Sequence, residues 1–122
     1  MTEPLALVVY EKLLPGSQLV NRLQDLKYRV QSLNDPQGLV ETAEEQKPML
    51  LIVDLDFRQG DVNGAILKLR QNPSTAHIPV LAFSAKELSS EPSGSSGVTL
   101  VVSEAAILNH LQQCLERVLQ LD

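Results

Sequence analysis

Pro-Met-Leu-Leu-Ile-Val-Asp-Leu-Asp, residues 48–56, is the most informative stretch of this chain. Five apolar residues run between Pro48 and Asp54. A run of that length is too short for a helix and is typical of a strand buried on both faces. Sheets covered on both faces are mostly parallel, with a helix crossing over between successive strands. The stretch therefore predicts a central strand of an α/β sheet, with the carboxylates of Asp54 and Asp56 at its carboxyl end.

Short apolar runs and amphipathic segments alternate along the rest of the chain. Further strands are predicted at residues 5–10, 28–33, 79–83 and 98–102. Apolar residues at helical spacing predict helices at residues 17–25, 38–46 and 61–71. A single last helix is expected to begin after Ser103 and to bury apolar side chains as far as Leu119. We expect Ser17, Asp61 and Ser103 to act as N-caps, because their side-chain oxygens can accept hydrogen bonds from the first helical N–H groups.

Strands and helices that alternate in this order predict a doubly wound parallel sheet with helices on both faces. The expected architecture is a flavodoxin-like (βα)5 sheet with strand order 2-1-3-4-5. The fourth helix is expected to be short or disordered, because residues 93–97 are all Ser or Gly. Ligands of such sheets bind at the carboxyl ends of the strands. The polar residues expected at those ends are Tyr10, Glu11, Asp54, Asp56, Ser84 and Ser103.

Length and composition exclude several classes of function. The chain has 122 residues, which suits one domain, so we expect residues 1–122 to form a single unit. Its formal net charge of −5 argues against binding to nucleic acid or to an anionic membrane. The single cysteine, Cys114, excludes an intrachain disulfide and a multi-cysteine metal site. The chain lacks the roughly 18 consecutive apolar residues of a membrane span, and we expect a soluble cytoplasmic protein.

Two stretches resemble the receiver domains of bacterial response regulators, the CheY-like family of two-component systems. Residues 48–54 are similar to the family's third strand and its phosphoacceptor aspartate. Residues 69–85, Leu-Arg-Gln-Asn-Pro-Ser-Thr-Ala-His-Ile-Pro-Val-Leu-Ala-Phe-Ser-Ala, are similar to its third helix, fourth strand and hydroxyl site. The resemblance covers nearly the whole chain. It implies that Asp54 is the phosphoacceptor and that Ser84 senses the phosphoryl group.

The resemblance also implies a magnesium site. The family holds Mg²⁺ with two acidic residues after the first strand, whereas this chain has Tyr10 followed by Glu11, so only Glu11 supplies a carboxylate. Asp54 is the next implied ligand, and Asp56 stands where the family supplies a backbone carbonyl. Mg²⁺ prefers oxygen ligands in near-octahedral geometry. Because one carboxylate is lost, we expect Mg²⁺ binding to be weak or absent.

Two further positions depart from the pattern of the family. The lysine that the family places after the fifth strand is replaced by Ser103, which Glu104 follows. In the family that ammonium pairs with the acceptor carboxylate and with the phosphoryl oxygens, and such charge-assisted contacts contribute about 1.5–3 kcal/mol each. The switch aromatic, three residues before the lysine, corresponds to Leu100, which we expect to stay buried.

These residues leave three hypotheses open. The first is an atypical stand-alone receiver in two-component-type signal transduction, a non-enzymatic pseudo-receiver that acts mainly through protein–protein interaction. Its partner would be a histidine kinase, another receiver or an effector, and a homodimer through the first or last helix also stays open. The second is a working receiver that a histidine kinase phosphorylates on Asp54. The third is a flavodoxin-like small-molecule binder, which is disfavoured because residues 11–16 lack a Ser/Thr/Gly-rich phosphate cradle.

Overall fold

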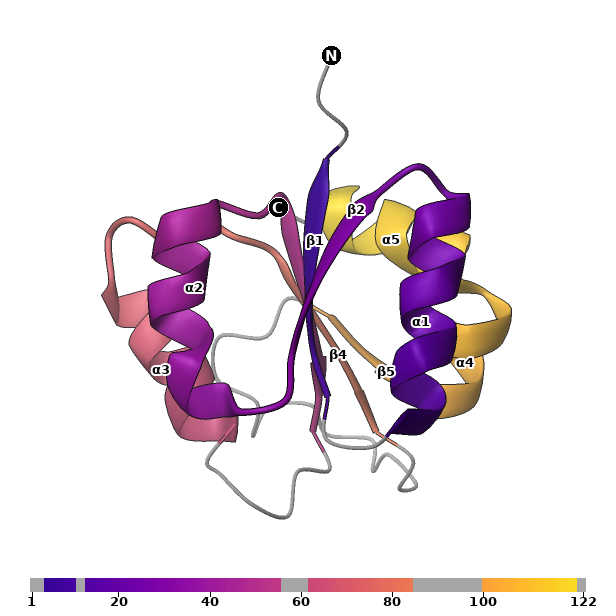
Figure 1. Ribbon diagram of the computed structural model, residues 1–122, viewed down its shortest axis with the longest axis horizontal. Coiled ribbons are helices and arrows are strands. Elements are labelled where there is room, and N and C mark those ends of the chain that lie inside the picture. The colour runs from indigo at the N-terminus through magenta and orange to yellow at the C-terminus, as the bar shows by residue number, and fades with distance from the viewer. Residues whose placement is uncertain (1–3, 11–12, 56–61, 85–99, 121–122) are drawn as a thin grey trace.

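The computed structural model describes residues 4–10, 13–55, 62–84 and 100–120, and within them it shows one five-stranded parallel sheet (Figure 1). The strands are β1 (Leu5–Val9), β2 (Arg29–Leu33), β3 (Leu50–Asp54), β4 (Val80–Ser84) and β5 (Leu100–Ser103). Their order is β2-β1-β3-β4-β5, and every neighbouring pair is parallel. The predicted flavodoxin-like strand order is therefore confirmed.

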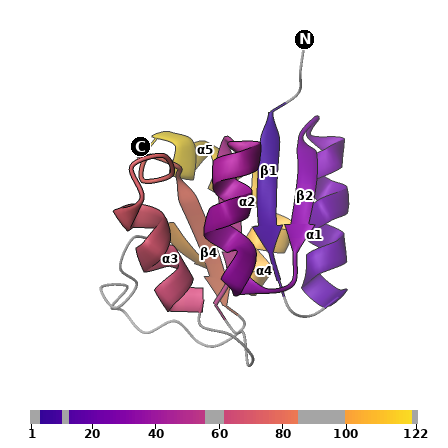
Figure 2. The same ribbon diagram turned by 60° about the vertical axis from the view of Figure 1, so that its left-hand side comes forward.

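Helices cover both faces of this sheet (Figure 2). They are α1 (Leu13–Asp25), α2 (Leu39–Gln46), α3 (Val62–Gln71), α4 (Glu104–Asn109) and α5 (Leu111–Gln120), with a short 3-10 turn, Pro36–Gly38, before α2. Figure 1 shows α1, α4 and α5 on one face and α2 and α3 on the other. The element types predicted for these parts of the chain are confirmed.

The core consists of two apolar clusters, one on each face of the sheet. The side chains of β1 alternate between them, because successive residues of a strand point to opposite faces. Ala6 and Val8 join the cluster beneath α1, α4 and α5, which we call the α1-side cluster, and Leu7 and Val9 join the cluster beneath α2 and α3. Every residue of β1, β3 and β4 is buried, whereas β2 and β5 form the partly exposed edges. The sheet is therefore buried on both faces, as the continuous apolar runs predict.

The first helix begins earlier than the sequence predicts. It starts at Leu13 rather than at Ser17, so Ser17 lies inside α1 and its predicted role as an N-cap is wrong. Pro15 falls in the first turn of the helix. The N–H groups of a first turn have no partner within the helix, so a proline there removes no helical hydrogen bond.

The single last helix predicted after β5 is also wrong, because the structure divides it into α4 and α5 at His110. The backbone of His110 leaves the helical region, with φ −132° and ψ 40°. The bend brings the Sγ atom of Cys114 to 3.9 Å from the carbonyl oxygen of Ala106, eight residues earlier. Eight residues of straight helix would rise about 12 Å. Ile107 of α4 and Leu115 of α5 both lie in the α1-side cluster, so both helices pack on this face of the sheet on either side of the bend.

Some predictions lie outside the described residues. These are the short or disordered fourth helix within residues 85–99, the start of the fifth strand at residue 98, and the cap at Asp61. Among the described helices, none combines the length and the apolar character that a membrane span requires.

Candidate functional site

Three polar residues end neighbouring strands at the carboxyl edge of the sheet. Asp54 is the last residue of β3, Ser84 of β4 and Ser103 of β5. The strand register pairs Asp54 with Phe83 and Ser84 with Ser103. Neighbouring strands are about 4.8 Å apart, so the ends of β3, β4 and β5 form one continuous row. The structure thus brings the predicted acceptor, the predicted hydroxyl and the lysine position to one edge.

Asp54 and Ser84 are set deep in this edge. Asp54 is 3% exposed and Ser84 is 5% exposed, which is unusual for polar side chains. The N–H of Leu55 donates to the carbonyl oxygen of Phe83 at 2.9 Å, so the ladder between β3 and β4 continues past Asp54. No buried side-chain nitrogen or oxygen in the described part of the chain lacks a hydrogen-bond partner. Asp54 and Ser84 are therefore nearly buried at adjoining strand ends, and each takes part in at least one interaction.

Ser103 has a different local role. Its side chain is exposed, and its Oγ accepts a hydrogen bond of 3.1 Å from the backbone N–H of Ala106. Ser103 is therefore the N-cap of α4, and this cap prediction is confirmed. Glu104 follows in the first turn of α4 and is partly buried. A neutral hydroxyl already engaged in capping thus stands where the resemblance places an ammonium group.

Tyr10 lies directly beside Asp54. Val9 pairs with Val53, so the residues that follow them, Tyr10 and Asp54, are neighbours across β1 and β3. The N–H of Tyr10 donates to the carbonyl oxygen of Leu33 at 2.9 Å, which extends the β1–β2 ladder by one residue. The partly buried ring packs against the α1-side cluster. An aromatic side chain therefore occupies the strand end where the resemblance calls for an acidic residue.

Leu100, at the position of the switch aromatic, begins β5 and is partly rather than fully buried. It packs against the α1-side cluster, as do Val102 and Leu108. A leucine side chain has no polar atom that could form a hydrogen bond at the surface. Moving it from a buried to an exposed position would therefore lose apolar burial without gaining a hydrogen bond.

The implied magnesium site is only partly within the described residues. Glu11 and Asp56 lie outside them, so Asp54 is the one member of the ligand set with a described position. The described residues contain no group of three or more His, Cys, Asp or Glu side chains that could hold a metal ion. Asp54 offers the oxygen ligand that Mg²⁺ prefers, but its described neighbours Tyr10, Ser84 and Ser103 supply no second carboxylate.

Sequence reasoning missed a groove that adjoins this site. It has a volume of about 560 Å³ and lies between α1, which contributes Gln18 and Arg22, and the start of α4, which contributes Glu104 and Leu108. Ser103 also lines it. No pattern in the sequence predicts this groove, because it depends on how α1 packs beside a helix whose length was itself mispredicted.

Comparison with known proteins bears on the fold. No protein-family model matches the chain, and no curated protein matches it either. Solved structures do match. The receiver domain of a Pseudomonas aeruginosa sensor histidine kinase, solved with a magnesium ion in its active-site cleft, is 21% identical with a TM-score of 0.85, covering 97% of this chain and 98% of that one.

Two response regulators give similar values. A structure of the chemotaxis protein CheY4 of Vibrio cholerae is 19% identical with a TM-score of 0.84, covering 95% of this chain and 98% of that one. A response regulator from Desulfuromonas acetoxidans is 21% identical with a TM-score of 0.81, covering 97% and 98%. The chain therefore has the fold of response-regulator receiver domains, and at the level of the fold the resemblance inferred from residues 48–54 and 69–85 is confirmed.

Proposed function

We propose that this chain is an atypical receiver domain of two-component-type signal transduction that acts through contact with a protein partner and has an impaired phosphoacceptor site. In this proposal residues 1–122 form one domain that works in the cytoplasm of a bacterium and is not an enzyme. Its partner is a histidine kinase, another receiver or an effector. Neither nucleic acid nor a membrane is a ligand, in keeping with the net charge of −5.

The observation that carries the proposal is the state of Ser103. A phosphoryl group on Asp54 would bring two negative charges to a nearly buried edge, and burying charge without an opposite charge is costly. Ser103 is neutral, and its Oγ already accepts from the N–H of Ala106. Glu104, next along the chain, carries a further negative charge. None of the three residues that end β3, β4 and β5 is therefore a cation that could offset the new charge, although Arg22 of α1 lines the groove beside Ser103.

Tyr10 supports the same conclusion. It is the neighbour of Asp54 on β1, and its ring packs into the α1-side cluster. Its side chain ends in a phenol and not in a carboxylate. It therefore contributes no negative charge to a magnesium site. Asp54 itself is 3% exposed, which restricts the approach of a phosphoryl donor to its carboxylate.

The alternative is a working receiver phosphorylated on Asp54. The adjacency of the two residues that would hold the phosphoryl group favours it, because Asp54 and Ser84 end neighbouring strands and are both buried. In this alternative Asp54, Glu11 and Asp56 would hold Mg²⁺, which would offset the charge of the transferring phosphoryl group. The chain's own part is then to hold the Asp54 carboxylate in place for attack and the Ser84 hydroxyl beside it.

Incubation with acetyl phosphate and Mg²⁺, followed by intact-protein mass spectrometry, distinguishes the impaired receiver from the working receiver. The proposal predicts no phosphorylated species in the wild-type chain beyond the amount that Asp54→Asn shows. Stoichiometric phosphorylation of the wild type, absent from Asp54→Asn, would contradict the proposal and establish the alternative.

A further inference from the structure

The outer edge of β2 leaves backbone groups without a partner. The strand order places β2 at one end of the sheet, and within the described residues no strand lies beyond it. The N–H of Arg29 donates to the carbonyl oxygen of Pro4 at 2.8 Å, so Arg29 and every second residue after it bond toward β1. The N–H and C=O groups of Val30 and Ser32 therefore point outward. Neither residue has a further hydrogen bond with another described residue.

This edge lacks the features that usually keep edge strands from pairing. Such strands are commonly protected by lysine, by proline, by a bulge or by being very short. β2 has five residues, contains neither lysine nor proline, and pairs with β1 in an unbroken register. Its one charged residue is Arg29, the first, which already takes part in an interaction within the chain. The four uncharged residues that follow therefore form a strip that is open to another strand.

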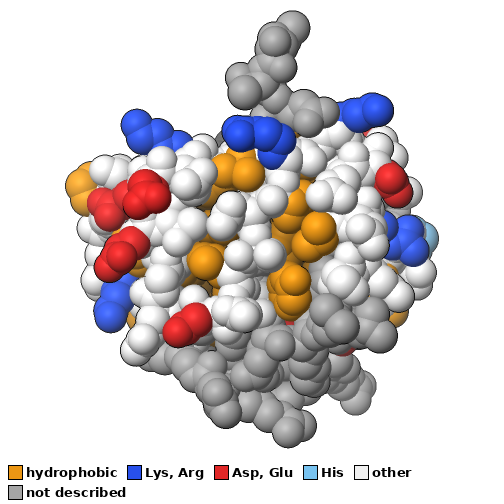
Figure 3. Space-filling model, viewed as in Figure 1, with side chains coloured by type: hydrophobic (Ala, Val, Ile, Leu, Met, Phe, Trp, Pro, Cys, Tyr) orange, Lys and Arg blue, Asp and Glu red, His pale blue; other side chains and the backbone are white. Residues whose placement is uncertain are grey.

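The helix beside this edge turns an uncharged side toward it. One side of α1 lines the groove toward α4, and another is buried in the α1-side cluster. At helical spacing, the third side carries Ser17, Val20 and Gln24. Figure 1 looks onto β2 and shows α4 behind α1, so this third side of α1 faces the edge. In the same view, Figure 3 shows hydrophobic side chains along the middle of this face, with Asp and Glu side chains to either side.

We propose that β2 pairs with the β2 of a second copy of this chain, antiparallel and across a two-fold axis, so that the two sheets become one. With the axis at Gln31, Val30 of each copy lies opposite Ser32 of the other. Each such pair exchanges two N–H···O=C hydrogen bonds. Four bonds then use all the outward groups of β2 in both copies, which no other antiparallel register of these five residues does. A second copy therefore supplies the partners that this edge lacks.

The side chains suit the same register. The two Gln31 side chains lie opposite each other at the axis, in a pair without backbone bonds, where side chains approach most closely. An amide carries both donors and acceptors, so Gln31 can hydrogen-bond with its own copy.

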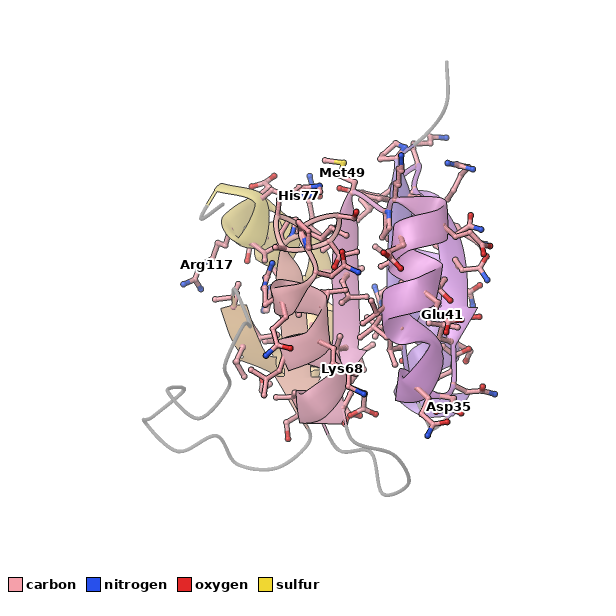
Figure 4. All side chains as sticks on the ribbon, turned by 90° about the vertical axis from the view of Figure 1, so that its left-hand side faces the viewer. Asp35, Glu41, Met49, Lys68, His77 and Arg117 are labelled. Atoms are coloured by element: carbon pink, nitrogen blue, oxygen red, sulfur yellow. The ribbon has the colours of Figure 1, made fainter. Side chains whose placement is uncertain are left out.

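The charges at the two ends of the strand are compatible with this register. Lys27 of each copy is placed near Asp35 of the other, and both residues are exposed. Figure 4 shows Asp35 on the side of the molecule that carries β2. Asp25 stands two residues before Lys27 and offsets part of its charge. The pairing therefore rests on the backbone groups of β2 rather than on this ion pair.

This inference goes beyond the proposed function and does not depend on it. β1 lies between β2 and β3, the strand that ends in Asp54. Asp54→Asn should therefore leave self-association unchanged. A monomeric chain and a phosphorylated chain are separate results, so the failure of one proposal is distinguishable from the failure of the other.

The first experiment is analytical ultracentrifugation of the full chain over a series of concentrations. One added strand is small beside the roughly 1,600 Å² of a standard interface, so we expect a dimer with a Kd of about 10–100 µM. Gln31→Lys brings two ammonium groups together at the axis and should weaken dimerisation about tenfold. Gln31 is exposed, so the urea midpoint should stay at the wild-type value. Leu67→Lys adds the same charge on the exposed face of α3 and should dimerise like the wild type.

Disulfide formation tests the register. Residues paired at the axis have Cα atoms about 4.5 Å apart, which suits a disulfide, so Gln31→Cys should form a covalent dimer on mild oxidation. Ser32→Cys is the control, because the two copies of that residue lie about 8 Å apart, beyond the reach of a disulfide. The wild type should form no covalent dimer, since Cys114 is buried.

Three results would overturn the proposal. A chain that stays monomeric at about 1 mM, ten times the weakest expected Kd, would leave the edge to a strand of a different protein. A dimer that Gln31→Lys leaves intact would have its contact elsewhere on the molecule. Equal cross-linking of Gln31→Cys and Ser32→Cys would contradict the register that pairs the backbone groups of β2.

Discussion

The ends of β4 and β5 lie side by side at the carboxyl edge, yet they serve different purposes. Ser84 is 5% exposed and follows four buried residues, so its position is set by the core. Ser103 is exposed, follows three partly buried residues, and caps α4. The register pairs these two serines directly. Packing of the sheet therefore fixes where both residues lie, whereas in the proposed function the side chain at the end of β5 decides whether the edge can hold a phosphoryl group.

This comparison indicates that the fold of the sheet and the chemistry of its carboxyl edge depend on different residues. The buried strands β1, β3 and β4 determine the sheet, and they place Asp54 and Ser84 as a receiver fold requires. Tyr10 and Ser103 lie just beyond β1 and at the end of β5, outside the fully buried residues of these strands, and we expect the sheet to tolerate changes there. The variants below test this separation, from the largest expected effect to the smallest.

Phe83→Ala should be the most damaging single change to stability. Phe83 is 1% exposed and is the largest fully buried side chain in the described core. Removing a buried phenylalanine side chain costs about 3–5 kcal/mol, because apolar contacts are lost and a cavity remains. Urea unfolding followed by circular dichroism measures the loss.

The matched variant is Leu100→Ala, on the neighbouring strand and in contact with the same α1-side cluster. Because Leu100 is only partly buried, we expect a smaller loss, of about 1–2 kcal/mol. If Leu100→Ala destabilised the chain as much as Phe83→Ala, the distinction between a core strand and an edge strand would be wrong.

Ser103→Lys should strengthen the binding of a phosphoryl mimic at the carboxyl edge. The new ammonium would pair with Asp54 and with a phosphoryl mimic, and a charge-assisted contact of about 1.5–3 kcal/mol corresponds to roughly tenfold tighter binding or more. A titration with beryllofluoride and Mg²⁺ measures that affinity. Leu67→Lys adds the same charge on the exposed face of α3 and should have no such effect. Equal behaviour of the two variants would show that the lysine position is not what limits the site.

Ser103→Ala should lower stability modestly. It removes the hydrogen bond that Oγ accepts from the N–H of Ala106, and loss of an N-cap costs about 1 kcal/mol. Ser103→Asp keeps a cap acceptor and should unfold near the wild-type urea midpoint. An unchanged midpoint for Ser103→Ala would mean that capping is not the role that keeps this hydroxyl engaged.

The smallest effect concerns stability at high pH. Burial raises the pKa of the Cys114 thiol above its ordinary value of 9.0, and the Arg117 guanidinium partly counteracts this. Burial likewise raises the pKa of Tyr28 above 10.0. Because both groups ionise more readily when unfolded, their contribution to stability is present below those values and is lost as pH rises through the folded-state pKa. Cys114→Ala should make the fall of the urea midpoint above pH 9 shallower, and an identical fall would contradict this assignment.

The fold could be predicted because its signal is local. Continuous apolar runs identify β3 and β4, and the polar residues that end them, Asp54 and Ser84, follow directly. The cap at Ser103 could be predicted because serine is favoured before an amphipathic segment, although the same signal at Ser17 gave a wrong prediction. The start of α1 could not, because Pro15 is compatible both with a break and with a first helical turn.

Features that depend on tertiary packing could not be predicted from the sequence. Nothing between Ser103 and Leu119 interrupts the helical periodicity, and neither Gly nor Pro stands at His110, yet the chain bends there. The groove between α1 and α4 follows from that packing. The positive φ of Lys27 and Lys47 was equally hidden, because lysine gives no indication of a left-handed conformation.

The most direct test of the central claim is a beryllofluoride titration of the wild-type chain in the presence of Mg²⁺, followed through the amides of Leu55, Ser84 and Ser103. Beryllofluoride stands in for a phosphoryl group on an aspartate carboxylate. We predict no saturable shift of these amides at millimolar Mg²⁺, because the residues that end β3, β4 and β5 supply one carboxylate and no lysine or arginine to hold the complex. Saturable shifts at all three amides that vanish in Asp54→Asn would contradict the account and show a working acceptor site.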